Sequence, residues 1–325
     1  MIINLSKPLL TSFTMYAAPL SLISEKANAY NWIYNNFNLL CCFKNDYDKL
    51  GIFYSPLEIR RYCPYIIYQN MQKNLFKKND REMIEFIQNC INNETALYLY
   101  VDHNYISNSY FYEIHDLFIY GIDNEREIIN ATDTCVMGKY SHIELSFTEF
   151  IKAFASPKAS RFGRENTIEL LSCDKNRPEI KFSKNQLIVQ LTDWLNSTCS
   201  DPRNDIADDL IFGIKVYEKL IEYMQYITGN GIEIDIRPFY VIAEHKKFIL
   251  NMLKHINLIG YSIDSQIMSS FREIYEISEI IRNIVLKLII ARDNLLFSDL
   301  IKRVETLRSH EYKALCDLLN NLIRF

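Results

Sequence analysis

Eight cysteines are scattered along the 325-residue sequence, and no two of them form a CxxC pair. Cysteine pairs at that spacing are the usual signature of a structural zinc site, so this class of site is not expected. The adjacent residues Cys41 and Cys42 are too close in sequence to act as such a pair. We therefore expect reduced thiols in a cytoplasmic protein, with no metal and no other cofactor.

Several other signals are missing. The sequence has no P-loop, no GxGxxG motif and no GxSxG motif, which argues against nucleotide-dependent chemistry and against an α/β-hydrolase. It has no apolar run close to the roughly 20 residues that a membrane-spanning helix needs. The net charge is −4 and Lys and Arg form no dense cluster, so there is no electrostatic reason to expect nucleic-acid binding. We expect neither a membrane nor a nucleic acid as a partner.

The length of the chain favours two domains, and the first part mixes helical and strand-like segments. Apolar residues at helical spacing after an Asp predict a helix at Asp80–Asn92. Residues Thr95–Ile106 are rich in Tyr, Leu and Val, which favours a strand. Ser146 and Glu149 have the spacing of a capping box and predict the start of another helix. We therefore predict an α+β domain over residues 1–160.

The rest of the sequence has a mostly helical pattern. Apolar residues recur every three or four positions from Phe271 to Leu288, and again from Leu300 to Leu322. Such stripes are typical of helices that bury one face in a bundle. We predict a mostly α-helical domain over residues 161–325, with a candidate strand in the connecting segment 157–182. The polar cluster at residues 244–246 is expected to make surface or interdomain hydrogen bonds.

The segment from Tyr110 to Asp133 predicts a β-hairpin with its first strand at Ile114–Tyr120 and its turn at Gly121–Asn124. This hairpin brings His115 and Asp133 to neighbouring strand ends. The turn is not centred between them, so we expect a bulge or an overhang. A carboxylate beside an imidazole is the arrangement in which His acts as a general base and Asp fixes its tautomer. The alternative is an ordinary histidine, partly buried and hydrogen-bonded in a strand.

The order of these motifs resembles the papain-like cysteine-peptidase fold. More narrowly, it is similar to the butirosin-biosynthesis type of N-terminal domain from bacterial natural-product gene clusters. In that family a D-x-Y-Y strand precedes a strand with His, a turn of the GYD type and a strand that ends in Asp. The matching residues are Asp102, Tyr105, His115, Gly121, Asp123 and Asp133. Two later segments, GIKVYEKL and DIRPFYVIAEHKKFI, are similar to recurring segments of the family. The resemblance implies His115 as base, Asp133 as its orienter, and ligand binding at Asp102 and Tyr105.

The family's nucleophile is a cysteine at the start of the first helix, where the helix dipole and the histidine lower its pKa. We predict that helix at Ser24–Phe43, and its first half contains no cysteine. Cys41 and Cys42 lie near its far end, about 15 Å further along a helix, and are the weak candidates for a nucleophile. The residues expected to line the cleft in place of a thiol are Asn31, Trp32 and Asn35.

We therefore predict a protein of bacterial specialised-metabolite biosynthesis with a degenerate Cys-His-Asp site. Its partner would be a peptide, a carrier protein or an acyl intermediate. The alternative is an active cysteine-dependent acyltransferase or peptidase that uses His115 and Asp133. A metal is a further possible use of the same histidine, because His103 lies close to it in sequence. No third ligand with informative spacing is found, and no metal site is predicted.

Overall fold

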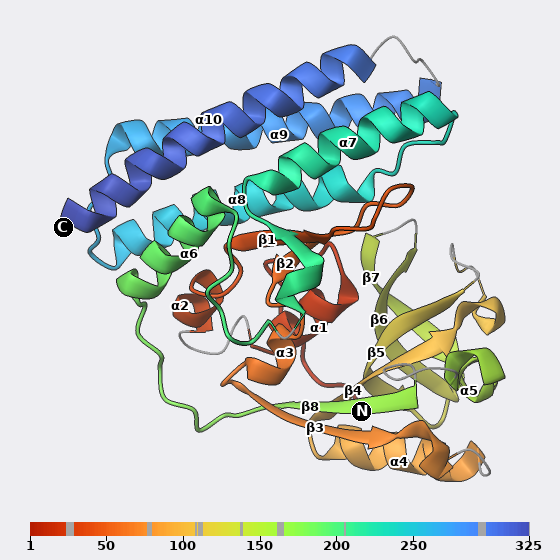
Figure 1. Cartoon of the computed structure of the whole chain (residues 1–325). Helices are drawn as coiled ribbons and strands as arrows, with labels where there is room; N and C mark the ends of the chain where they lie inside the picture. The colour runs from red at the N-terminus through yellow and green to blue at the C-terminus, as the bar shows by residue number, and fades with distance from the viewer. Residues whose placement is uncertain are drawn as a thin grey trace. The chain divides into compact units, whose positions relative to one another are not determined.

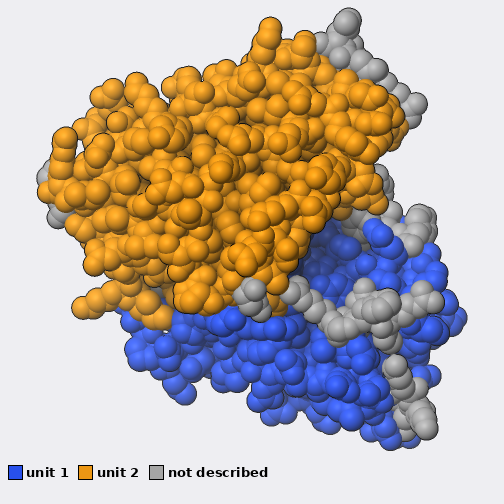
Figure 2. Space-filling model, viewed as in Figure 1, with its two compact units in different colours: residues 1–29, 60–179 blue, residues 30–59, 180–325 orange. Residues whose placement is uncertain are grey.

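The computed structural model describes residues 1–23, 29–76, 80–107, 109, 113–136, 139–160, 166–204, 206–291 and 297–324. The chain divides into two compact units, each built from two separate stretches of sequence (Figures 1 and 2). The sheet unit contains residues 1–29 and 60–179, and the helical unit contains residues 30–59 and 180–325. The predicted boundary at residue 160 therefore differs from the observed division, in which each unit is discontinuous in sequence.

A six-stranded antiparallel sheet forms the centre of the sheet unit, as far as that unit is described. In spatial order its strands are β3 (Ile66–Gln72), β8 (Thr167–Cys173), β4 (Thr95–Asp102), β5 (Ile114–Asp123), β6 (Ile128–Val136) and β7 (Lys139–Ser146). The helices of this unit are α1 (Thr14–Ile23), α3 (Ile59–Tyr62, whose first residue belongs to the other unit), α4 (Asp80–Asn92) and α5 (Phe147–Ala155). Short 3-10 turns lie at η1 (Lys73–Phe76), η2 (His103–Tyr105) and η3 (Pro157–Ser160).

The hydrophobic core of the sheet unit lies between one face of the sheet and the helices α4 and α5. Alternate residues of β4, such as Leu97 and Leu99, are fully buried on this face. Helix α4 contributes Met83, Ile87 and Ile91, whose spacing of four residues places them on one side of the helix. The predicted helix at Asp80–Asn92 is confirmed, and the mixed α and β character of this region is as expected.

The hairpin formed by β5 and β6 is longer than predicted. Strand β5 continues through Gly121 to Asp123, so the turn lies further along the chain than the predicted Gly121–Asn124. The Asp123 carboxylate accepts hydrogen bonds from the amides of Glu125 and Arg126 at 3.1 Å each, which is a local side-chain turn that the sequence pattern does not locate. The pairing shifts register between Ile119 and Gly121, so the expected bulge is confirmed.

Helix α5 begins at the predicted capping box. The Ser146 hydroxyl accepts a hydrogen bond from the Glu149 amide at 3.2 Å, and the Glu149 carboxylate accepts one from the Ser146 amide at 2.9 Å. The other carboxylate oxygen of Glu149 accepts a hydrogen bond from the Ser107 amide at 3.1 Å. Burial opposes ionisation of Glu149, but these hydrogen bonds from Ser107 and Ser146 outweigh it and lower the pKa of the carboxyl to about 2.

This lowered pKa predicts a defined loss of stability in acid. An unfolded Glu has a pKa near 4.5, so the folded chain binds fewer protons than the unfolded chain between about pH 4.5 and 2. The contribution of Glu149 to the free energy of unfolding is therefore fully present above pH 4.5 and falls as the pH is lowered towards 2. We expect Glu149→Gln to be less acid-sensitive than the wild type in urea unfolding measured across this range. The exposed Glu144→Gln is the control, and equal acid slopes for Glu149→Gln and the wild type would contradict the prediction.

The helical unit combines a small sheet with long helices. Its antiparallel strands are ordered β2 (Ile52–Ser55), β1 (Leu39–Phe43) and β9 (Leu210–Phe212). Its helices are α2 (Ala29–Tyr34, whose first residue belongs to the sheet unit), α6 (Lys184–Asn196), α7 (Lys215–Asn230), α8 (Arg237–Leu258), α9 (Ser265–Ala291) and α10 (Phe297–Arg324), with a 3-10 turn at η5 (Ala207–Asp209). Figure 1 shows α7, α9 and α10 running alongside one another. No helix among the described residues is both long and apolar enough to cross a membrane.

The predicted helix at Ser24–Phe43 is wrong. Residues 24–28, including the proposed cap Ser24, lie outside the described residues, and α2 ends at Tyr34. Leu39–Phe43 is the central strand of the small sheet, with β2 on one side and β9 on the other. Its first four residues are all buried. A short continuous apolar run of this kind has no periodicity by which a helix can be distinguished from a strand.

A charged network lies in the interior of the helical unit, where surface or interdomain contacts are predicted from the sequence. The Lys246 ammonium is 2.6 Å from a Glu311 carboxylate oxygen, and both side chains are fully buried. The Tyr217 hydroxyl donates to the other Glu311 oxygen at 2.6 Å. Lys246 also donates to Nδ1 of His245 at 3.0 Å and lies 4.6 Å from the centre of the Trp194 ring. The surface prediction is therefore wrong for Lys246 and His245.

Candidate functional site

His115 and Asp133 lie beside each other in the sheet unit. Val101 of β4 is the direct partner of His115 of β5, and Phe118 of β5 is the partner of Thr132 of β6. Continuing this register by one residue places Asp133 diagonally across from His115 on the same face of the sheet. The Nδ1 atom of His115 is 3.2 Å from Oδ1 of Asp133. The hairpin therefore brings the two residues together as predicted, with the side chains at hydrogen-bond distance.

A second histidine completes this cluster. His103 is the first residue after β4, and its amide donates to the Glu113 carbonyl at 3.1 Å, which continues the pairing of β4 with β5. Its Nε2 atom is 3.1 Å from Oδ2 of Asp133. The rings of His103 and His115 meet edge to face with their centres 5.5 Å apart. One carboxylate therefore lies between two imidazoles, and the three residues come from three adjacent strands or the residue directly after one.

Burial differs sharply across the cluster. The side chains of His103 and Asp133 are fully buried, whereas that of His115 is 27% exposed. His115 is therefore the side through which solvent or a ligand reaches the cluster. The Nδ1 atom of His103 lies 3.0 Å from the Ser109 hydroxyl, and the Thr134 amide donates to Oδ1 of Asp133 at 2.5 Å. These contacts fix the orientation of both buried side chains.

Asp116 gives His115 a second acidic neighbour. Its Oδ1 atom is 2.9 Å from Nδ1 of His115, and the Tyr98 hydroxyl donates to its other oxygen. The Arg60 guanidinium lies 4.7 Å from the centre of the Tyr98 ring and makes a bidentate ion pair with the buried Glu169. Polar contacts therefore run without interruption from β8 through β4 and β5 to the cluster on β6.

The charge on His115 follows from these neighbours. Burial by itself lowers the pKa of the imidazole, but the carboxylates of Asp116 and Asp133 outweigh this effect and raise it from 6.5 to about 11. For Asp116, burial is opposed by the imidazolium of His115, the Tyr98 hydroxyl and Arg60, and its pKa is lowered. In the absence of another cation, the pair is an imidazolium beside carboxylates at neutral pH.

The cysteines considered as nucleophiles lie in the other unit. Cys41 and Cys42 are central residues of β1 in the helical unit, and both are fully buried. Burial, with a smaller effect of neighbouring thiols, raises the pKa of Cys41 well above its ordinary value. Burial likewise raises the pKa of Cys42 to about 12. In the sheet unit, burial raises the pKa of Cys63 to about 12 and that of Cys90 to about 11. All four thiols are therefore protonated near neutral pH.

The residues expected to line a cleft beside His115 make internal contacts of the helical unit. The Asn35 side chain exchanges two hydrogen bonds with the backbone of Ser183, at 2.8 and 2.9 Å, just before α6. The Trp32 side chain is buried and meets Phe37 edge to face. Oδ1 of Asn31 lies 2.7 Å from Nε2 of His255. The structure does not bring these residues and His115 together in one unit, and their proposed ligand contacts stay a prediction.

Asp102 and Tyr105 have different environments. Asp102 is buried, and its carboxylate accepts hydrogen bonds from the Ser156 hydroxyl at 2.6 Å and the Asn104 amide at 3.1 Å. These contacts cap the turn η2 and tie it to the end of α5. Tyr105 is 45% exposed, so its ring is accessible to a ligand. Of the two residues, Tyr105 is the better placed to contact one.

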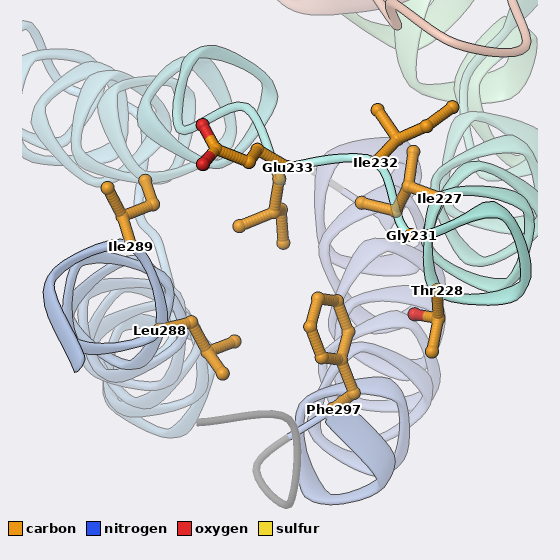
Figure 3. A pocket seen from close by; sticks show the side chains of 9 residues that line it. Ile227, Thr228, Gly231, Ile232, Glu233, Leu288, Ile289 and Phe297 are labelled. Carbon is orange, nitrogen blue, oxygen red and sulfur yellow. The ribbon is translucent and has the colours of Figure 1, made fainter. Parts of the chain in front are cut away.

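A separate cavity of about 240 Å³ lies in the helical unit, at the ends of helices α7, α9 and α10. Figure 3 shows Leu288 and Phe297 pointing into it, with Thr228 and Glu233 nearby. Its lining is mainly aliphatic, with one carboxylate and no histidine or cysteine among its described residues. It offers mainly a surface for apolar contact, with Glu233 and Thr228 as the residues that bring a polar side-chain group.

Sequence patterns point to His115 and Asp133 and do not point to Asp116. Successive strand residues face opposite sides of a sheet, which argues against a contact between the adjacent side chains of His115 and Asp116. At the end of the strands the two side chains nevertheless meet at 2.9 Å. His103 is detectable from the pairing itself, because it lies two residues beyond the direct partner of His115.

The sequence matches no protein-family model and no curated protein at a significant level. The function is therefore inferred from the chemistry of this cluster and from the resemblance of the motifs around it.

Proposed function

We propose that this chain is a papain-like-fold protein of bacterial specialised-metabolite biosynthesis that binds a peptide, a carrier protein or an acyl intermediate without forming a covalent adduct. The observation that carries the proposal is the position of Cys41 and Cys42 in the middle of a buried strand. A thiol with a pKa near 12 is ionised to only about one part in 10⁵ at pH 7. Such a thiol is a poor nucleophile towards a thioester or a peptide bond.

The papain-like part of the proposal is supported by the order and pairing of the strands. Strand β4 leads to Asp102, its neighbour β5 carries His115, and the next strand, β6, carries Asp133. Helix α5 then follows β7. This is the order of motifs on which the resemblance rests. The His115 imidazole contacts the carboxylates of Asp116 and Asp133, the backbone carbonyl of Asp116 and the ring of His103.

One observation favours the alternative of an active cysteine-dependent acyltransferase or peptidase. The distance of 3.2 Å between His115 and Asp133 suits a base and its orienting carboxylate. This alternative requires a thiol within hydrogen-bond distance of the His115 ring. The two proposals therefore differ in one measurable property, which is the reactivity of the cysteines in the folded protein.

The non-covalent proposal predicts that the folded protein forms no acyl-enzyme. We expect no stoichiometric acetyl adduct after incubation with the acetyl thioester of N-acetylcysteamine, measured by intact-mass spectrometry at pH 7.5. The same chain unfolded in guanidinium should react at several of its eight cysteines, which shows that the probe is competent. A single adduct on one cysteine of the folded protein, lost in the corresponding Cys→Ser variant, would establish the acyltransferase alternative. Cys42→Ser is the first variant to examine.

The binding part of the proposal has its own measurement. We expect acyl thioesters of N-acetylcysteamine, or a short peptide carrying an acylated phosphopantetheine arm, to bind in isothermal titration calorimetry. Tyr105→Ala should weaken that binding at least several-fold, since this exposed ring lies in η2 next to the His103 cluster. Tyr312→Ala, which removes an equally exposed ring from α10, is the matched control. Absence of binding by all these probes would contradict the proposed binding role.

A further inference from the structure

We propose that His103, His115 and Asp133 bind one divalent transition-metal ion of the Zn²⁺ type. One ligand atom from each of the three residues, two imidazole nitrogens and a carboxylate oxygen, lies within 4.8 Å of the others. The three residues come from the end of β4, the start of β5 and the second half of β6. Strand pairing therefore fixes their spacing, although they are separated by 12 and 18 residues in the sequence.

The distances suit ligands that share one ion. Ligands at about 2.1 Å from a metal lie about 3.0 Å apart when they subtend a right angle, and about 3.4 Å apart in a tetrahedron. Nε2 of His103 is 3.1 Å from Oδ2 of Asp133, and Nδ1 of His115 is 3.2 Å from Oδ1 of the same carboxylate. These two contacts use different oxygens of the Asp133 carboxylate, and one ligand atom from each of the three residues lies within 4.8 Å of the others.

Two buried polar atoms point at each other without making a hydrogen bond. Nε2 of His103 and Oδ2 of Asp133 are both inaccessible to solvent, and neither has a hydrogen-bond partner among the described residues. A buried donor or acceptor without a partner costs about 1–3 kcal/mol. A cation between the nitrogen lone pair and the carboxylate oxygen satisfies both atoms at once. This pair of atoms is the observation, independent of the clustering, that points to a bound ion.

The surrounding contacts are of the kind that orient metal ligands. The Ser109 hydroxyl lies 3.0 Å from Nδ1 of His103, so a proton on Nδ1 is held there and Nε2 is left as the ligand atom. The Thr134 amide donates to Oδ1 of Asp133, which fixes the carboxylate. Asp116 lies 2.9 Å from Nδ1 of His115, the same nitrogen that approaches Asp133, so a metal ion bound at Nδ1 takes the place of this contact.

The ligand set also indicates the class of ion and the type of site. Two imidazoles and one carboxylate suit Zn²⁺, Co²⁺ or Fe²⁺, whereas Mg²⁺ and Ca²⁺ prefer ligand sets made only of oxygen. Three protein ligands leave at least one coordination position for water or for an oxygen of a bound molecule. His115 is the exposed member, so that position opens towards solvent. This inference does not depend on the proposed function, because it concerns occupancy by the metal alone.

The test uses the full chain, treated with a chelator and then titrated with Co²⁺ at pH 7.5. We expect a visible absorption band that saturates at one equivalent, is abolished by Zn²⁺ and is unaffected by millimolar Mg²⁺. His103→Gln and Asp133→Asn should each weaken the apparent affinity more than about 100-fold. Ser109→Ala, which removes only an orienting contact, should weaken it about 10–100-fold. The control is His142→Gln, because His142 is an exposed histidine of β7 that hydrogen-bonds Tyr120 outside the cluster.

Circular dichroism identifies any variant that fails to fold, and X-ray absorption of the Zn²⁺-loaded wild type keeps the test decisive in that case. We expect a first shell of nitrogen and oxygen with the scattering pattern of two imidazoles. A first shell that contains sulfur would place the metal at cysteines and overturn the proposal. So would the absence of a cobalt band at a tenfold excess of metal, or a band of full strength in a folded His103→Gln/Asp133→Asn variant.

Discussion

Replacing Glu311 by Ala should lower the free energy of unfolding of the helical unit by about 3–5 kcal/mol, because it leaves a buried ammonium without its carboxylate partner. The Lys246 side chain is fully buried and has Glu311 at 2.6 Å. Its other contacts, with His245 and with the rings of Trp194 and Tyr217, carry no negative charge. The two tryptophans of the chain, Trp32 and Trp194, both belong to this unit. Urea unfolding followed by tryptophan fluorescence therefore reports on it directly.

Two further variants isolate the effect of the unpaired charge. Arg303→Ala removes an ion pair on the same helix whose side chains are 43% and 49% exposed, and it should change the free energy of unfolding by less than about 1 kcal/mol. Lys246→Met combined with Glu311→Leu removes both charges and should recover most of the loss. A cost below about 1 kcal/mol for Glu311→Ala would show that Lys246 is neutral in the folded protein.

Replacing Arg60 by Ala should destabilise the sheet unit by a similar amount, about 3–5 kcal/mol. The Arg60 and Glu169 side chains are 2% and 3% exposed and form a bidentate pair. Among the described residues, the cation that remains near Glu169 after the guanidinium is removed is Arg61, which is 39% exposed and lies 3.8 Å away. Hydrogen exchange of peptides from β4 and β8, measured by mass spectrometry, follows the sheet unit without depending on tryptophan.

The matched control for Arg60 is Arg126→Ala on the hairpin of the same sheet. The Arg126 and Glu144 side chains are 59% and 51% exposed at a distance of 3.0 Å, so breaking this pair should cost less than about 1 kcal/mol. Arg60 also lies over the Tyr98 ring, whose hydroxyl holds Asp116 beside His115. We therefore expect faster exchange at the start of β5 in Arg60→Ala than in Arg126→Ala. Equal protection in the two variants would contradict the role assigned to Arg60.

Local sequence patterns predict the helices whose formation depends on nearby residues, such as a capping residue or a regular apolar stripe. The helix at Asp80–Asn92 has an acidic start and a regular apolar stripe, and the helix after Ser146 has a capping box; both are present. The long helices α9 and α10 likewise follow from their stripes. Leu39–Phe43 is a strand where the sequence pattern predicts a helix, because a buried central strand and a short helical segment cannot be told apart in an apolar run. The pairing of β1 with β2 and with β9 distinguishes them.

The same distinction applies to the site. The contact between His115 and Asp133 was predictable, because a hairpin links the two residues over a short stretch of chain. His103 directly follows a different strand, β4. Both histidines can contact Asp133 because β4, β5 and β6 are aligned side by side in the sheet. The burial of Lys246 has the same origin, because its partner Glu311 lies 65 residues away in sequence. Local sequence patterns do not predict contacts between segments that are far apart in the sequence.

The discontinuous units also constrain the order in which the chain folds as it is synthesised. Strand β8 (Thr167–Cys173) lies between β3 and β4 in the sheet, so β3 cannot join the sheet until β8 has emerged from the ribosome. Strands β1 and β2 are synthesised early, but the small sheet is complete only after β9 (Leu210–Phe212) has been synthesised. At 5–20 residues per second, the interval between β1 and β9 is roughly ten to thirty seconds. During that interval the apolar run Leu39–Phe43 has one edge without its final partner, so a nascent chain stalled before residue 210 should be the species most prone to aggregate or to recruit a chaperone.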